Sequence, residues 1–211
     1  RLGRKPMSYR AVFRTTQAEL GQAFRKAPVL PAATPSKPRK SVFLLPGQGS
    51  QFVGMGKQLY KTAEKYREVV DFCAQGLKPL IGLDLRELLH SDDPDALDSV
   101  NETLGKTANA QPALFVVEYA LAMQLMDWGL RPDILFGHSI GEITAACLAE
   151  VFSLEDGLEI VAARSRVMQK CEPGAMMVVF ASVPETKPLL PAGVETKTPS
   201  ATNFFINFFD P

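Results

Sequence analysis

Residues 134–148 contain the feature that most constrains how this chain can fold. A short apolar strand over 134–136 runs directly into the pattern Gly-x-Ser-x-Gly at 137–141, and a helix of small residues follows over 143–148. This order is typical of a nucleophile elbow, in which a strained strand-to-helix turn lifts a serine hydroxyl to the edge of a sheet. A Cβ at either flanking glycine would clash in so sharp a turn. The sequence therefore predicts Ser139 as a nucleophile, with a structural glycine-rich turn as the alternative.

The composition is that of one globular domain, or one and a fraction. The 211 residues carry 23 basic and 23 acidic side chains, and 46% of them are hydrophobic. A neutral chain without a long run of like charge gives no reason to expect nucleic acid or a membrane surface as a partner. No apolar run reaches the length of a membrane span, and no signal peptide is recognisable. Because the chain begins with arginine, we expect a fragment of a longer protein.

Cysteine usage indicates a reducing compartment. Cys73, Cys147 and Cys171 are odd in number and lack the spacing of metal ligands. They predict buried free thiols, a cytoplasmic location and no metal site.

The first forty residues predict a small element followed by a linker. Residues 9–14 alternate between apolar and polar side chains as a strand does, and Thr16 is placed to cap a short helix through Phe24. Four prolines then punctuate residues 28–38, which favours a stiff linker over a helix or a central strand.

The rest of the chain alternates strands and helices. We expect buried strands at 41–45 and 134–136 and a further strand at 176–181. We also expect a long amphipathic helix over 59–73, a loop-rich segment at 76–107, a helix from Pro112 to Gly129 with a buried face, and a helix to about 170 capped by Ser153. The buried face of the second helix comprises Leu114, Val117, Leu121, Leu125 and Trp128. Strands separated by helices predict an α/β fold with a parallel sheet. The aromatic-rich run at 199–211 has no closing element and would form a sticky exposed edge.

The elbow, the loop Gly-Gln-Gly-Ser-Gln at 47–51 and the helix start Gln-Pro-Ala-Leu at 111–114 occur together. With these motifs, residues 41 to about 182 resemble the malonyl-CoA:acyl carrier protein transacylase family. More particularly, they resemble the acyltransferase domain of a type I polyketide synthase or multidomain fatty acid synthase.

This resemblance implies a domain organisation. Residues 41–172 would form the N-terminal part of a parallel-sheet, α/β-hydrolase-like large subdomain, and residues 173–211 would begin a ferredoxin-like small subdomain that is truncated at its C-terminus. Residues 1–27 resemble the end of the short α/β linker between a ketosynthase and its acyltransferase, and residues 28–40 would be the proline-rich linker.

The resemblance also implies an activity. Ser139 would take an acyl group from coenzyme A as an ester and pass it to the phosphopantetheine thiol of an acyl carrier protein, with no bound cofactor. Gln48 and the backbone N–H of Ile140 would form the oxyanion hole. Gln111 would line the acyl pocket, unless it only bonds backbone groups at its helix start, and His138 would belong to the substrate-binding elbow. A ketosynthase and other domains of a megasynthase would be partners.

Arg164 would bind the free carboxylate of a malonyl or related dicarboxylic acyl group. A planar guanidinium can bind a carboxylate through two hydrogen bonds, which a lysine cannot. Helical spacing places Arg164 on a face with Gly157, Ile160 and Val167, which we expect to point inward, whereas Arg166 shares a more polar face. The alternative is a structural ion pair with a nearby carboxylate.

The general base of the family is a histidine that would lie beyond residue 211. The chain has two histidines. His138 precedes the nucleophile and should project away from its hydroxyl, and His90 is expected to be a surface residue that caps carbonyls at a helix end. We therefore expect the chain alone to be nearly inert.

Two other functions stay open at this point. An α/β-hydrolase esterase shares Gly-x-Ser-x-Gly but leaves the Gln48 loop and Arg164 unexplained. A non-catalytic, truncated fragment is the second alternative. The sequence does not separate malonyl from methylmalonyl as the acyl group.

Overall fold

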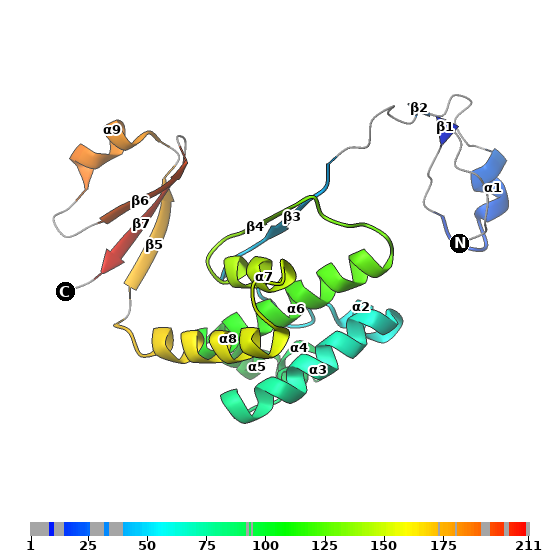
Figure 1. Cartoon of the computed structure of the whole chain (residues 1–211), viewed down its shortest axis with the longest axis horizontal. Helices are drawn as coiled ribbons and strands as arrows, with labels where there is room; N and C mark the ends of the chain where they lie inside the picture. The colour runs from blue at the N-terminus through cyan, green and yellow to red at the C-terminus, as the bar shows by residue number, and fades with distance from the viewer. Residues whose placement is uncertain are drawn as a thin grey trace. The chain divides into compact units, whose positions relative to one another are not determined.

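A computed structural model describes residues 9–10, 15–25, 32–33, 40–91, 93, 95–172, 174–179, 181–190, 195–200 and 203–209. The chain divides into two compact units, residues 1–41 and 42–211 (Figure 1). In the first unit, β1 (Tyr9–Arg10) pairs antiparallel with β2 (Ala32–Ala33). Of the strand predicted over 9–14, residues 11–14 lie outside the described residues.

Helix α1 (Leu20–Arg25) corrects the expected role of Thr16. The hydroxyl of Thr16 donates to the Glu19 carboxylate at 3.0 Å, and the Glu19 N–H binds the Thr16 carbonyl at 3.2 Å. Thr16 therefore closes a turn that precedes the helix. It does not cap the helix itself.

The second unit contains a parallel pair, β3 (Val42–Leu45) and β4 (Ile134–Gly137), in which Leu45 lies opposite Gly137. Phe43 and Leu45 are buried, but Val42, Leu44, Ile134 and Phe136 are exposed. The prediction of fully buried strands was therefore wrong. Side chains alternate between the two faces of a strand, and helices cover one face of this pair in the described part of the chain.

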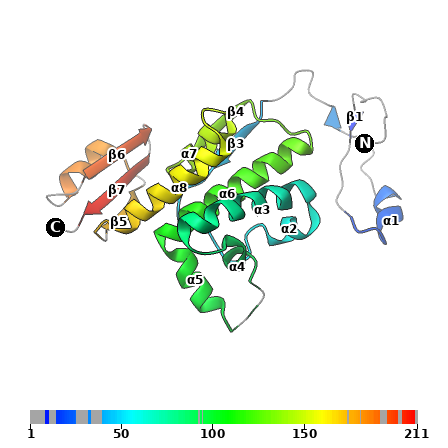
Figure 2. The same cartoon turned by 60° about the horizontal axis from the view of Figure 1, so that its bottom comes forward.

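Seven helices of the described residues form the body beside this sheet: α2 (Lys57–Thr62), α3 (Glu64–Ile81), α4 (Leu85–Leu89), α5 (Leu97–Gly105), α6 (Thr107–Asp127), α7 (Ile140–Leu148) and α8 (Leu154–Gln169). Helices α3, α7 and α8 all pack on α6, as Figures 1 and 2 show. Their shared core includes Tyr66, Phe115, Ile140 and Leu158.

Helix α6 differs from its prediction in start and in orientation. It begins at Thr107, so Pro112 lies inside the helix and not at its first position. Leu114 is buried as expected, but Leu121 and Trp128 are exposed. Because three helices surround α6, its burial follows no single stripe. Gly129, with φ of 92°, ends the helix as predicted.

A second correction concerns residues 59–107. The helix expected over 59–73 is broken at Ala63, whose backbone is extended, because the side-chain oxygen of Gln124 on α6 accepts the Tyr66 N–H at 2.9 Å at the start of α3. The segment expected to be loop-rich contains the end of α3 together with α4 and α5. Asp84 caps α4 by accepting the Arg86 N–H at 3.1 Å.

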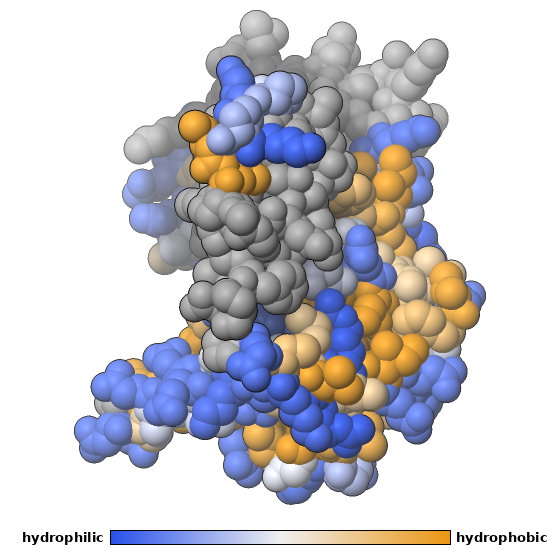
Figure 3. Space-filling model, turned by 90° about the vertical axis from the view of Figure 1, so that its left-hand side faces the viewer, coloured by the Kyte–Doolittle hydropathy of each residue, from blue (hydrophilic) through white to orange (hydrophobic). Residues whose placement is uncertain are grey.

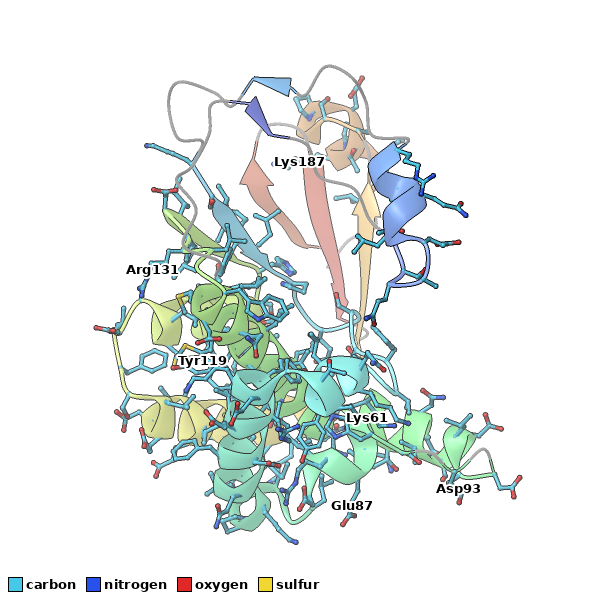
Figure 4. All side chains as sticks on the ribbon, turned by 90° about the vertical axis from the view of Figure 1, so that its right-hand side faces the viewer. Lys61, Glu87, Asp93, Tyr119, Arg131 and Lys187 are labelled. Atoms are coloured by element: carbon cyan, nitrogen blue, oxygen red, sulfur yellow. The ribbon has the colours of Figure 1, made fainter. Side chains whose placement is uncertain are left out.

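Helix α8 confirms one prediction and corrects another. Ser153 Oγ accepts the Asp156 N–H at 3.0 Å, which is the predicted cap. The face predicted to point inward is wrong, since Ile160 and Val167 are exposed. The buried stripe comprises Gly157, Leu158, Val161, Ala162 and Ser165. Figure 3 shows apolar and hydrophilic side chains side by side on the surface of the helical body. Figure 4 draws the side chains of the described residues, with Glu87 of α4 and Tyr119 of α6 labelled.

The C-terminal part contains β5 (Gly174–Val179), α9 (Val183–Thr186), a 3-10 turn η1 (Lys187–Leu189), β6 (Glu195–Ser200) and β7 (Asn203–Phe209). The strands form an antiparallel sheet in the order β5-β7-β6. The aromatic-rich run was expected to form an exposed edge. The aromatic run instead forms the central strand, because its backbone pairs on both sides.

Two further expectations concern cysteines and membranes. Cys73 and Cys147 are buried, but Cys171 is exposed, so the prediction of three buried thiols fails at Cys171. Among the described helices, none combines the length and apolarity that crossing a bilayer requires.

Candidate active site

The predicted nucleophile elbow is present. Ser139 has φ of 55° and ψ of −111°, a strained conformation for a residue with a Cβ, between the end of β4 and the start of α7. A Cβ on Gly137 would lie 2.2 Å from the Gly141 carbonyl group, and one on Gly141 would lie 2.2 Å from the Leu45 carbonyl oxygen. The two glycines are therefore required by close backbone contacts, and the Ser139 hydroxyl stands on a rigid turn.

The loop after β3 lies directly against this elbow. The His138 N–H donates to the Leu45 carbonyl at 3.0 Å, and a Cβ on Gly47 would come within 2.5 Å of His138 Nδ1. The parallel pairing of β3 and β4 brings both strand ends to the same edge, where ligands bind in open α/β sheets. Gln48 and Ser139 are thereby brought to one region.

Side-chain hydrogen bonds join three of the predicted site residues. Gln111 Nε2 on α6 donates to Gln48 Oε1 at 3.2 Å, and Arg164 Nη1 on α8 donates to Gln111 Oε1. Arg164 Nη2 donates to Ser139 Oγ at 3.1 Å. The alternative for Gln111, a residue that only bonds backbone groups at a helix start, is wrong. Gln111 lies in the second turn of α6, and its side-chain partners are side chains.

The Arg164 guanidinium is half-buried and has no ion-pair partner among the described residues. No described carboxylate oxygen lies within 4.0 Å of the guanidinium. The alternative role of Arg164, a structural ion pair, is therefore wrong for the described part of the chain. Burial lowers the pKa of Arg164, and the more distant Glu142 carboxylate opposes that shift. A desolvated cation beside the Ser139 hydroxyl is suited to binding an anionic group there.

Two backbone donors are available near Ser139. Among the described residues, the N–H groups of Gln48 and of Ile140 donate no hydrogen bond. The Gln48 side-chain amide is occupied, because its Nε2 donates to Thr107 Oγ1 at 3.0 Å and its Oε1 accepts from Gln111. An oxyanion contact from Gln48 would therefore come from its backbone N–H.

Comparison with known proteins decides the family. The sequence profile described as "Acyl transferase domain" matches residues 42–193. The chain belongs to this family. Its site thus combines an acyltransferase elbow with the side chains of α6 and α8.

The relatives of this acyltransferase chain include type I polyketide synthases. It is 42% identical over 156 residues to "Phenolphthiocerol synthesis polyketide synthase type I Pks15/1" of Mycobacterium marinum, which covers 74% of the chain and 7% of that protein. The acyl transferase domain of SpnD, solved in complex with 2-(pent-4-yn-1-yl)malonyl, superposes with a TM-score of 0.79 at 39% identity. That match covers 99% of this chain and 49% of the domain.

A free-standing enzyme is also similar. The malonyl-CoA:ACP transacylase of Synechocystis sp. PCC 6803 superposes with a TM-score of 0.64 at 32% identity over 80% of this chain and 54% of that one. The chain thus spans about half of the solved acyltransferases and 4 to 10% of the curated polyketide synthases that it matches.

Neither histidine of the acyltransferase chain is hydrogen-bonded to Ser139. His138 packs beside Gly47. His90 ends α4 as expected, but its ring is half-buried against Tyr60, with centroids 4.2 Å apart, and its Nε2 has no partner among the described residues. The prediction that His90 is a surface residue capping carbonyls was therefore wrong. Burial, then the nearby Lys57, lowers the pKa of His90.

Sequence reasoning missed two residues that support the site. Thr107 accepts from Gln48, and Met168 Sδ accepts from Gln111 Nε2 at 3.3 Å. Each lies four residues from a predicted site residue on the same helix, Thr107 before Gln111 and Met168 after Arg164. The (i, i+4) spacing of helix neighbours was the available signal.

The site residues include no cluster suited to a metal. Among the residues that the structure describes, no group of three or more His, Cys, Asp or Glu side chains is arranged to hold an ion.

Proposed function

We propose that this chain carries the nucleophile and the acyl-binding side of an acyltransferase that uses malonyl or a related dicarboxylic acyl group. The observation that carries the proposal is the Arg164 guanidinium, 3.1 Å from Ser139 Oγ and without a carboxylate partner among the described residues. In a malonyl thioester the free carboxylate is separated from the reacting carbonyl by one carbon. A cation adjacent to the nucleophile can therefore hold that carboxylate while Ser139 attacks.

The reaction would proceed in two steps. Ser139 Oγ forms a bond to the thioester carbonyl carbon, the carbon–sulfur bond breaks, and coenzyme A leaves as a thiol that carries the serine proton. The phosphopantetheine thiol of an acyl carrier protein then attacks the Ser139 ester and returns a proton to Ser139. The N–H groups of Gln48 and Ile140 would stabilise the negative oxygen in both steps.

The side chains around Ser139 support distinct roles in this proposal. Arg164 would bind the acyl carboxylate, and Gln111 would orient the guanidinium through its Oε1. Since His138 packs beside Gly47, it would shape the elbow and the substrate-binding wall and would not act as the base. The similarity to a malonyl-CoA:ACP transacylase and to a domain bound to a malonyl derivative supports this choice of substrate class.

We also propose that the chain by itself transfers acyl groups slowly. A serine nucleophile needs a base to accept its proton, and the Ser139 hydroxyl is bonded to Arg164, not to a histidine. Removing one member of such a catalytic unit can cost on the order of 10⁶ in turnover. In the intact protein, residues 1–27 would continue a linker from a ketosynthase, residues 28–40 would be a proline-rich connection, and an acyl carrier protein would accept the product in the cytoplasm.

The proposal is tested by intact mass after long incubation with malonyl-CoA, methylmalonyl-CoA or acetyl-CoA. We expect a malonyl or methylmalonyl adduct on the wild-type chain, none on Ser139→Ala, and much less with acetyl-CoA. An adduct of equal yield from acetyl-CoA, or rapid hydrolysis of a simple ester with no malonyl adduct, would favour an esterase and contradict the proposal. No adduct with any thioester would favour a non-catalytic fragment.

A further inference from the structure

Glu118 is a buried carboxyl group that the proposed reaction does not use. It lies on α6 with 7% of its surface exposed. Its Oε2 accepts a hydrogen bond from Thr144 Oγ1 on α7 at 2.8 Å, while its buried Oε1 has no partner among the described residues. Thr144 is itself fully buried. The pair is therefore a hydrogen bond between two helices inside the core.

This bond connects α6 and α7, two of the three helices that build the site. Thr144 lies one turn after Ile140 on the helix that starts at the nucleophile, and its hydroxyl is also 3.4 Å from the Ile140 carbonyl oxygen. Glu118 lies two turns after Gln111 on α6, hence on the same side of that helix. One side of α6 thus holds both Gln111 in the acyl pocket and the contact that fixes the start of α7.

Among the described residues, no cation is paired with the carboxyl group of Glu118. Burial raises its pKa to about 7, and donation from Thr144 opposes the shift. No charged side chain of the surrounding helices contributes. Among the described residues of α3, α6 and α7, the other titratable groups whose pKa burial raises are Tyr66, Cys73, Tyr119 and Cys147, so all four are neutral. The half-buried Arg164 of α8 is bonded to Gln111 and Ser139.

We propose that Glu118, through its hydrogen bond to Thr144, is a positioning residue that holds the nucleophile helix α7 against α6, and that it does so best when its carboxyl group is neutral. In the neutral form Oε1 carries the proton and Oε2 accepts from Thr144. Ionisation places a charge without an ionic partner in the core. The Thr144 donor offsets only part of that cost, so the packing of α7 on α6 loosens and Ser139 is displaced relative to Gln111.

The direct test follows the Glu118 carboxyl carbon by ¹³C NMR in the full chain, assigned with the Glu118→Gln variant. We expect a titration midpoint well above that of exposed glutamates. Thr144→Val removes a donor to the carboxylate and should raise the midpoint further, whereas Thr144→Ser should leave it unchanged. A midpoint in the ordinary glutamate range, or one that Thr144→Val does not move, would overturn the proposal.

A second test uses urea unfolding at pH 6.0 and pH 8.5. The urea midpoint of the wild-type chain should be lower at pH 8.5 than at pH 6.0. The urea midpoint of Glu118→Gln should be the same at both pH values. Glu159→Gln, a change at an exposed carboxylate on α8, should retain the wild-type fall. The comparison relies on the pH difference within each variant, so a general loss of stability in Glu118→Gln does not obscure it. Equal pH dependence of wild type and Glu118→Gln would contradict the proposal.

A third test measures acyl-ester formation and therefore rests on the proposed function. The rate of acyl-ester formation by wild type relative to Glu118→Gln should fall about threefold or more between pH 6.0 and 8.5, because about nine in ten Glu118 carboxyl groups are ionised one pH unit above their pKa. A constant ratio would rule out a positioning role. If no acyl ester forms in any variant, the proposed function fails, while the NMR and unfolding arms still decide the Glu118–Thr144 pair.

Discussion

Arg164 Nη2 donates a hydrogen bond to Ser139 Oγ at 3.1 Å, so the cation that would bind the substrate carboxylate directly contacts the proposed nucleophile. Its other nitrogen, Nη1, donates to Gln111. A substrate carboxylate that takes over the guanidinium would compete with Ser139 for the same donor. Substrate binding and release of the nucleophile would then be one event.

Arg164→Lys should reduce malonyl-adduct formation roughly tenfold to a hundredfold, because an ammonium cannot make the two parallel hydrogen bonds of a guanidinium. Acetyl-adduct formation should change much less. Arg166→Lys is the matched control, since Arg166 is exposed on the same helix. Equal losses with malonyl-CoA and acetyl-CoA would show that Arg164 acts on Ser139 alone.

Thr107→Val should lower adduct formation about threefold to tenfold, because it removes the acceptor that holds the Gln48 amide and so loosens the loop that carries the backbone donor. Thr107→Ser keeps a hydroxyl at the same place and should retain most of the rate. The rate of adduct formation is followed by intact mass at several malonyl-CoA concentrations. The loss should appear in the maximal rate. A loss in the serine variant equal to that in the valine variant would contradict this role.

Gly141→Ala should destabilise the chain by about 3 kcal/mol or more, since the new Cβ would lie 2.2 Å from the Leu45 carbonyl oxygen and neither backbone can move independently. Gly105→Ala is the control. No atom lies within 4 Å of its added Cβ, so a gain of up to about 1 kcal/mol is expected. Urea unfolding of the two variants measures the difference, and similar stabilities would argue against the elbow geometry.

Stability should also fall in acid through Asp84. Its hydrogen bonds to Arg86 hold the pKa of Asp84 at about 2, below the value of about 4 in an unfolded chain. A depressed pKa stabilises the fold above the unfolded value, and this contribution, about 2 kcal/mol, is lost as the pH falls from about 4 to 2. The Asp84→Asn variant should be less stable than wild type at pH 7, and its free energy of unfolding should change less with pH below pH 4. Chemical denaturation of wild type and Asp84→Asn across this pH range measures how the free energy of unfolding of each depends on pH.

Local sequence determined the parts of the fold that depend on near neighbours. Gly141 also meets the distant Leu45 carbonyl, but the turn itself could be predicted because Gly137 and Gly141 are in contact within five residues, where steric exclusion leaves few backbone conformations. The Ser153 cap and the Gly129 helix end are local for the same reason. These features needed no knowledge of distant contacts.

Contacts between distant residues decided what local patterns could not. The break at Ala63 follows the bond from Tyr66 to Gln124, and the burial of α6 on several sides follows from the helices packed on it. The aromatic strand β7 became central through pairing with β5 and β6.

The sequence by itself named Ser139, Gln48 and Arg164 as candidate site residues. Only the tertiary structure decided that Arg164 reaches Ser139, 25 residues away in the chain, and that Glu118 bonds Thr144, 26 residues away. Spacing along a helix fixes which side chains share a face. The packing of helices and the cost of burying unpaired polar groups decide which faces meet.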